Sequence, residues 1–146
     1  MRGFHHIGIA VNNLEDAIAF FERVYGARVV WRETYREEKF ETALVSLGHL
    51  RFELLSGLDS GSFVSKFIET RGEGVHHVSL EVDRFSEVIA NFRQNGLKVI
   101  GETDTKDFRA AFIHPQGNFG VLTEIIEPKG GWANKDHYPQ GKPDKK

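Results

Sequence analysis

The chain opens with the stretch GFHHIGIAV at residues 3–11, which returns as GVHHVSLEV at residues 74–82. The segments after the two copies are also alike, because each has the pattern of an amphipathic helix, ends at a glycine and leads into a new strand. An internal repeat of this length indicates one structural module written twice. The repeat therefore predicts the fold more directly than any single motif does.

Alternation within the repeated strand separates two kinds of histidine. Successive side chains of a strand point to opposite faces, so His6 and His77 fall among small or polar neighbours. The preceding histidines, His5 and His76, fall on the apolar face that packs under a helix. We expect a metal and a ligand to have room beside His6 and His77, and we expect His5 and His76 to be structural.

The same spacing selects two glutamates. His6 and His77 are 71 residues apart, and so are Glu53 and Glu124, each of which lies inside a short apolar run. A carboxylate in a buried strand is costly unless it is paired or bound to a cation. Two histidines and two glutamates, one of each per copy, form a chemically sensible site for a divalent metal.

Composition narrows the class of protein. The chain has 146 residues, of which 40% are hydrophobic, and this fits one globular domain. The net charge of −2 predicts no nucleic-acid partner, and the lack of cysteine excludes disulfides, iron–sulfur clusters and thiol nucleophiles. No signal peptide is visible, and no apolar run approaches the ~20 residues of a membrane span. We expect a soluble, cytoplasmic protein without a membrane partner.

The element pattern predicts an α+β fold of two tandem βαβββ modules. The modules are residues 3–55 and 74–126, and residues 56–73 link them through a loop and a short helix. We expect a single domain, residues 1–127, whose eight strands form a curved mixed sheet around a cleft. From residue 128 to 146 the chain turns polar, which predicts a tail.

Local signals predict where several elements begin or end. Asn13 can cap the first helix, and Asp83 can cap the corresponding helix of the second module. Residues 33–39 are charged and are expected to form a loop or an exposed hairpin. Trp132 and Tyr138 could hold the first part of the tail against the surface.

Together these features resemble the vicinal-oxygen-chelate superfamily, which includes glyoxalase I, ring-cleaving dioxygenases and antibiotic-resistance proteins. Within it, the chain is most similar to the methylmalonyl-CoA epimerases. The resemblance rests on the histidine repeat, on FIETRGEGVHH at residues 67–77, and on FIHP at 112–115 with GVLTE at 120–124. It covers residues 3–127, nearly everything but the tail.

The resemblance implies a glyoxalase-like fold and an isomerase that removes the proton alpha to a thioester through a metal-stabilised enolate. One divalent ion, Co, Mn, Zn or Ni, would be held by His6, Glu53, His77 and Glu124. Glu124 would serve both as ligand and as base. The same resemblance implies an acyl-CoA thioester as the substrate and a homodimer as the assembly.

The second proton carrier departs from the pattern of the epimerases. Those enzymes have a second glutamate on the strand before the central turn, where this chain has Thr42. Glu41 is adjacent, but an offset of one residue points it to the other face unless a bulge re-aims it. The candidates are therefore Thr42, Glu41, another group or water, and a reaction with one base is a further alternative.

Two other classes of function remain open. One is a different metal enzyme on the same scaffold, either a glyoxalase I-like isomerase (lactoylglutathione lyase) or an iron dioxygenase. Two glutamates argue against the dioxygenase, whose facial triad has two histidines and one carboxylate. The other is a metal-free protein that binds or sequesters a small molecule, which would be expected to lack the four ligands.

Overall fold

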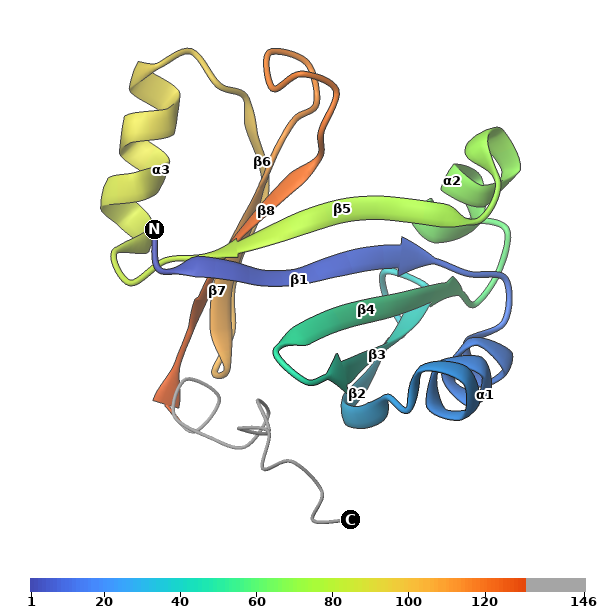
Figure 1. Ribbon diagram of the computed structural model, residues 1–146. Helices are drawn as coiled ribbons and strands as arrows, with labels where there is room; N and C mark the ends of the chain where they lie inside the picture. Colours follow the sequence, from blue (N-terminus) through green and yellow to red (C-terminus); the bar gives the residue numbers. More distant parts are fainter. Residues whose placement is uncertain (131–146) are drawn as a thin grey trace. The chain divides into compact units, whose positions relative to one another are not determined.

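The computed structural model describes residues 1–130, so the predictions about Trp132 and Tyr138 lie outside the described residues. The elements follow in the order β1 (Gly3–Ala10), α1 (Leu14–Tyr25), β2 (Arg28–Tyr35), β3 (Phe40–Leu47), β4 (Leu50–Gly57), α2 (Phe63–Arg71), β5 (Gly74–Glu81), α3 (Phe85–Gln94), β6 (Val99–Asp104), β7 (Phe108–Ile113) and β8 (Thr123–Pro128) (Figure 1). This order is the βαβββ plan written twice, with α2 in the linker. Within residues 1–130, no helix combines the length and the apolar character needed to cross a membrane.

The strands form one mixed sheet in the order β2-β3-β4-β1-β5-β8-β7-β6. β1 pairs in parallel with β4, and β5 pairs in parallel with β8. The remaining pairs within each half, β2 with β3, β3 with β4, β6 with β7 and β7 with β8, are antiparallel. The α+β class and the eight-stranded mixed sheet predicted from the repeat are confirmed.

The described residues fall into two compact units. Residues 7–76 form the N-terminal unit, and residues 1–6 together with 77–130 form the C-terminal unit. The boundaries cut through β1 and β5, so His6 and His77 both belong to the C-terminal unit. Within that unit the backbone N–H of Arg2 donates to the carbonyl of Glu81 at 2.7 Å.

In the N-terminal unit, α1 packs on one face of β3 and β4. The side chain of Asn13 accepts a hydrogen bond from the backbone of Asp16 at 2.9 Å, as expected of the cap, and Gly26 ends the helix with φ 68°. Since helical residues four apart lie on one face, α1 buries a single stripe. The core comprises Leu14, Ile18, Ala27, Ala43, Val45 and Leu54.

The short helix α2 packs on the other face of the same unit. Leu54 belongs to the core under α1, whereas the next residue, Leu55, is buried with Ala10 and with Val64 of α2. Adjacent strand residues point to opposite faces, so β4 is covered on both sides. The linker therefore contributes to the core.

The C-terminal unit repeats the packing of the N-terminal unit. Its core comprises Val82, Phe85, Ile89, Ala111, Ile113 and Ile125, with α3 packed against the strands (Figure 1). Leu14, Ile18 and Leu54 of the first core each have a counterpart 71 positions later in this set. The repeat thus extends from the motif into the packing of the helices.

Two predicted boundaries are wrong, and one prediction about a charged stretch is confirmed. Asp83 does not cap α3, because the N-cap position is Arg84 and no side chain makes the capping hydrogen bond. Residues 33–39 form an exposed hairpin, as predicted, because the last residues of β2 pair with β3 and residues 36–39 make the turn. β8 ends at Pro128, one residue into the predicted tail.

Candidate active site

The two repeated histidines meet in the C-terminal unit. His6 on β1 and His77 on β5 are each 3% exposed, and their Nε2 atoms lie 3.0 Å apart. The rings meet edge to face, with centroids 5.2 Å apart and an interplanar angle of 82°. Two imidazole nitrogens at this separation can share a proton or bind one cation together.

Glu124 on β8 lies beside this pair. It is paired across the strands with Ser79 of β5, whose hydroxyl donates to Glu124 Oε1 at 2.7 Å. The same oxygen lies 3.7 Å from His6 Nε2. Burial raises the pKa of Glu124 to about 7, and the hydrogen bond from Ser79 opposes that rise. Nε2 of His6 therefore lies close to both His77 Nε2 and Glu124 Oε1.

The side chains of these three residues are of the types that bind divalent cations. Two imidazole nitrogens and a carboxylate oxygen are donors that suit Zn, Co, Ni and Mn. Burial disfavours the charged form of Glu124, and a cation beside the carboxylate would offset that cost. The ring of Phe112 lies against His77 at 5.5 Å, and such an apolar wall strengthens the electrostatic interactions of a bound ion.

Glu53 has the equivalent position in the N-terminal unit. It lies on β4 opposite Gly8 of β1, as Glu124 lies on β8 opposite Ser79 of β5. Residues opposite each other on neighbouring strands project to the same face. The half-buried Glu53 therefore projects from the sheet face of Gly8. Its role as a ligand stays a prediction.

Strand pairing places Thr42 on the same face as Glu53. On β3, Leu44 pairs with Glu53 and Thr42 pairs with Leu55. Paired residues, and residues two apart on one strand, project to the same face, so these four side chains share one face of the sheet. Thr42 is 1% exposed, and its hydroxyl has no hydrogen-bond partner among residues 1–130. A buried hydroxyl without a partner costs about 1–3 kcal/mol. This orphaned oxygen marks a position where a ligand could supply the missing bond.

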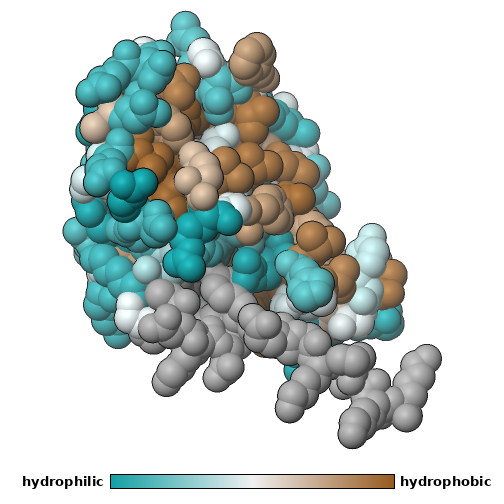
Figure 2. Space-filling model, turned by 60° about the vertical axis from the view of Figure 1, so that its left-hand side comes forward, coloured by the Kyte–Doolittle hydropathy of each residue, from teal (hydrophilic) through white to brown (hydrophobic). Residues whose placement is uncertain are grey.

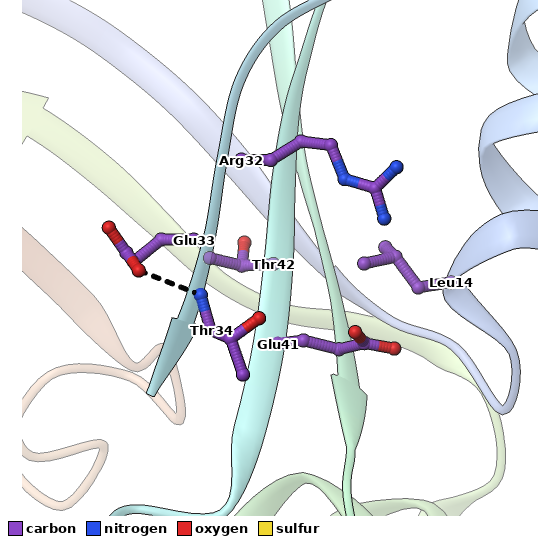
Figure 3. Close-up of a pocket in the computed structure, with 6 residues that line it drawn as sticks. All are labelled: Leu14, Arg32, Glu33, Thr34, Glu41 and Thr42. Carbon is purple, nitrogen blue, oxygen red and sulfur yellow. Dashed lines mark hydrogen bonds between the residues drawn. The ribbon is translucent and has the colours of Figure 1, made fainter. Parts of the chain in front are cut away.

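Glu41 lies on the other side of β3. Figure 3 shows Glu41 and Arg32 extending toward Leu14 of α1, while Thr42 extends away from them. They border a pocket of about 200 Å³. The carboxylate of Glu15, which accepts a hydrogen bond from Arg32, raises the pKa of the guanidinium, and Glu41 adds to the rise. The pairing of β3 with β4 is continuous, so no bulge turns Glu41 toward the face of Thr42.

His76 has an apolar environment in the N-terminal unit. The rings of Phe63 and Phe67, both on α2, have centroids 5.5 and 4.9 Å from its own. Burial lowers the pKa of His76 to about 4, and the positive charge of Arg71 lowers it further. The side chain is therefore neutral at physiological pH and packs against a helix, as expected from its strand face.

Two contacts of the site were missed by sequence reasoning. The hydroxyl of Ser79 holds Glu124, and a signal for it existed, because Ser79 follows His77 by two residues on the same strand face. His5 is buried, as expected, but its Nδ1 lies 2.6 Å from Nδ1 of His6. No periodic pattern could predict that contact, because alternation assigns the two side chains to opposite faces.

Residues 5–112 match the sequence model of the Glyoxalase/Bleomycin resistance protein/Dioxygenase superfamily. The chain belongs to this superfamily. It is 33% identical over 138 residues to "Uncharacterized protein YqjC" of Bacillus subtilis (strain 168), covering 92% of this chain and 99% of that protein. It is 30% identical over 125 residues to the mitochondrial methylmalonyl-CoA epimerase of Bos taurus, covering 83% of this chain and 71% of that protein.

The fold of the chain is also similar to that of a solved structure. The methylmalonyl-CoA epimerase of Streptomyces coelicolor, in complex with 2-nitronate-propionyl-CoA, superposes with a TM-score of 0.83 at 27% identity, covering 89% of this chain and 99% of that one. The glyoxalase-like fold implied by the resemblance is confirmed.

Proposed function

We propose that the chain is a metal-dependent epimerase of the methylmalonyl-CoA epimerase type. The reaction would move the proton on the carbon between a thioester and a carboxylate. The closeness of His6 to both His77 and Glu124 carries the proposal, because it supplies metal donors and a carboxylate side by side. The epimerases among the relatives support an acyl-CoA substrate over other substrates of the superfamily.

We assign the proposed metal site to His6, Glu53, His77 and Glu124. The first three could hold one ion, since each offers a suitable ligand atom. Glu53 is supported further by its strand pairing, which repeats that of Glu124. Two nitrogen and two oxygen ligands suit Co, Mn, Zn or Ni. The chemistry that a bound divalent cation supplies is stabilisation of negative charge on the substrate oxygens.

Glu124 is the proposed base. Ser79 and His6 both approach Oε1 of this carboxylate. We therefore assign proton transfer to the other oxygen, Oε2. The hydrogen bond from Ser79 fixes the orientation of the carboxylate, and a fixed base loses less entropy when it reaches the substrate.

Thr42 is the proposed second polar contact to the substrate. Epimerisation requires a proton to leave one face of the planar intermediate and to arrive on the other. The orphaned hydroxyl of Thr42 can pass a proton between substrate and water, or can position a water that does so. Glu41 is the weaker candidate, because it lies on the α1 side of β3.

Proton exchange in D₂O tests the function. With Zn²⁺ or Co²⁺ present, we expect the protein to exchange the α-proton of methylmalonyl-CoA for deuterium in NMR spectra, and chelator should abolish the exchange. Conversion of the methylglyoxal–glutathione adduct to lactoylglutathione instead would assign the lyase activity. Inactivity on both substrates with stoichiometric metal bound would contradict both assignments.

Assembly as a homodimer stays a prediction. Apolar residues gather on the face of the molecule in Figure 2, and exposed apolar patches commonly mark protein–protein contacts. Light scattering after gel filtration would give the mass in solution, and the mass of a single chain at micromolar concentration would contradict the prediction.

A further inference from the structure

The short contact between the adjacent histidines of β1 carries one more inference. Nδ1 of His5 lies 2.6 Å from Nδ1 of His6, and the rings meet at 73° with centroids 4.9 Å apart. Both side chains are almost completely buried, with 1% and 3% of their surface exposed. Two nitrogens this close must share one proton, because two lone pairs or two N–H groups would repel each other.

The direction of this hydrogen bond follows from the other end of the His6 ring. Nε2 of His6 is the atom that faces His77 Nε2 at 3.0 Å and Glu124 Oε1 at 3.7 Å. A nitrogen that binds a metal must present its lone pair. Neutral imidazole has a single N–H, so the proton of His6 then sits on Nδ1 and points at His5.

We propose that His5 is a positioning residue whose Nδ1 accepts the Nδ1–H of His6, fixing the His6 tautomer that turns the Nε2 lone pair toward the metal site. His5 then carries its own proton on Nε2. The acceptor holds the ring of His6 in place and raises the basicity of its Nε2. It also disfavours the opposite tautomer, which would direct an N–H into the site.

This inference rests on the proposed metal site, and its test uses Zn²⁺ alone as the probe. Asparagine at position 5 keeps an acceptor at the δ position, whereas leucine has a similar size and no acceptor. We expect His5→Leu to weaken Zn²⁺ binding by about 10–100-fold, the usual effect of losing such a partner. We expect His5→Asn to stay within about 3-fold of the unmodified protein, since the acceptor remains. Competition with a zinc-binding dye measures both affinities.

A spectroscopic readout separates positioning from packing. In ¹⁵N-labelled, Zn²⁺-loaded protein, a hydrogen bond between the two rings should give a scalar coupling from Nδ1 of His6 to Nδ1 of His5. A buried histidine that only fills space would give none. Circular dichroism shows whether the His5→Leu variant folds. If it does not fold, the scalar coupling in the unmodified protein becomes the test, and absence of the coupling overturns the proposal.

The outcomes also distinguish this inference from the metal site itself. Retention of Zn²⁺ by His77→Ala would defeat the metal site. Loss of Zn²⁺ in His77→Ala together with unchanged affinity in His5→Leu would defeat only the role of His5. Equal weakening by His5→Asn and His5→Leu would likewise overturn it, because the acceptor would then be irrelevant.

Discussion

His6 and His77 stand 71 positions apart in the chain, yet their Nε2 atoms lie 3.0 Å from each other. The two compact units divide β1 directly after His6 and β5 directly before His77, so the pair lies within one unit. Both rings are buried. Neutral imidazole is the form that binds a metal.

Removing either histidine should release the metal. We expect His6→Ala and His77→Ala to weaken binding by more than the ~100-fold that loss of an outer partner costs, while the fold is kept. The exposed His49, in the turn between β3 and β4, gives the matched control His49→Ala, which should keep the metal. Elemental analysis of the untagged protein measures its metal content. Stoichiometric metal in both variants would contradict the ligand assignment.

Replacing the proposed base should stop exchange at the substrate. Glu124→Gln keeps the shape of the side chain and its contact with Ser79, but it cannot take a proton. We expect deuterium incorporation from D₂O to slow by about 10²–10⁴-fold, the usual contribution of a general base. The exposed Glu69 on α2 supplies the control Glu69→Gln. The metal content of the Glu124→Gln variant must be measured in the same experiment. Unimpaired exchange by a variant that still binds metal would show that Glu124 is not the base.

The raised pKa of Glu124 predicts how the stability of the metal-free protein depends on pH. Its carboxyl has a pKa of about 7 in the folded state because of burial, against an ordinary 4.5. Between these values the unfolded chain ionises while the folded protein stays protonated, so the free energy of unfolding falls as pH rises from about 4.5 through 7. At about 1.4 kcal/mol per pKa unit, the loss is on the order of 3–4 kcal/mol.

Urea unfolding at pH 5 and pH 8, with chelator present, measures this dependence. Other groups titrate over the same range, so the comparison is with Glu124→Gln, which lacks the carboxyl. We expect the variant to lose less stability than the unmodified protein on going to pH 8. Equal losses in the two proteins would show that burial does not disfavour the charge of Glu124.

Replacing Thr42 should lower the activity of the protein without lowering its stability. Thr42→Val removes the orphaned hydroxyl at constant shape, so we expect stability to stay equal or to rise by about 1 kcal/mol. If the hydroxyl serves the substrate, exchange should slow by about 10²-fold. The exposed Thr34 gives the control Thr34→Val, and Glu41→Gln should leave the rate intact. Full activity in Thr42→Val would place the second proton carrier elsewhere.

Much of the site could be predicted because repetition and alternation are both visible in the sequence. The shift of 71 residues predicts the pairings of Glu53 with Gly8 and of Glu124 with Ser79, since equal spacing in equal modules gives equal strand register. The same reasoning separates Glu41 from Thr42, and the continuous pairing of β3 with β4 agrees with it. Register is a property of the backbone, and the pattern of residues encodes it.

Side-chain rotation is not encoded in that way. The contact between His5 and His6 depends on how two rings turn about their own bonds, which alternation does not describe. The cap of α3 failed for a related reason: an aspartate near a helix start is a common signal, but the backbone began the helix one residue too late for Asp83 to reach it.

The two duplicated strands differ where they meet their glutamates. Ser79 offers a hydroxyl to Glu124, whereas Gly8 has only a hydrogen atom to set against Glu53. A gene duplication yields interchangeable carboxylates at first, and a single hydroxymethyl group is enough to end that equivalence. One serine can thus divide the labour between two carboxylates that the backbone places in equivalent positions.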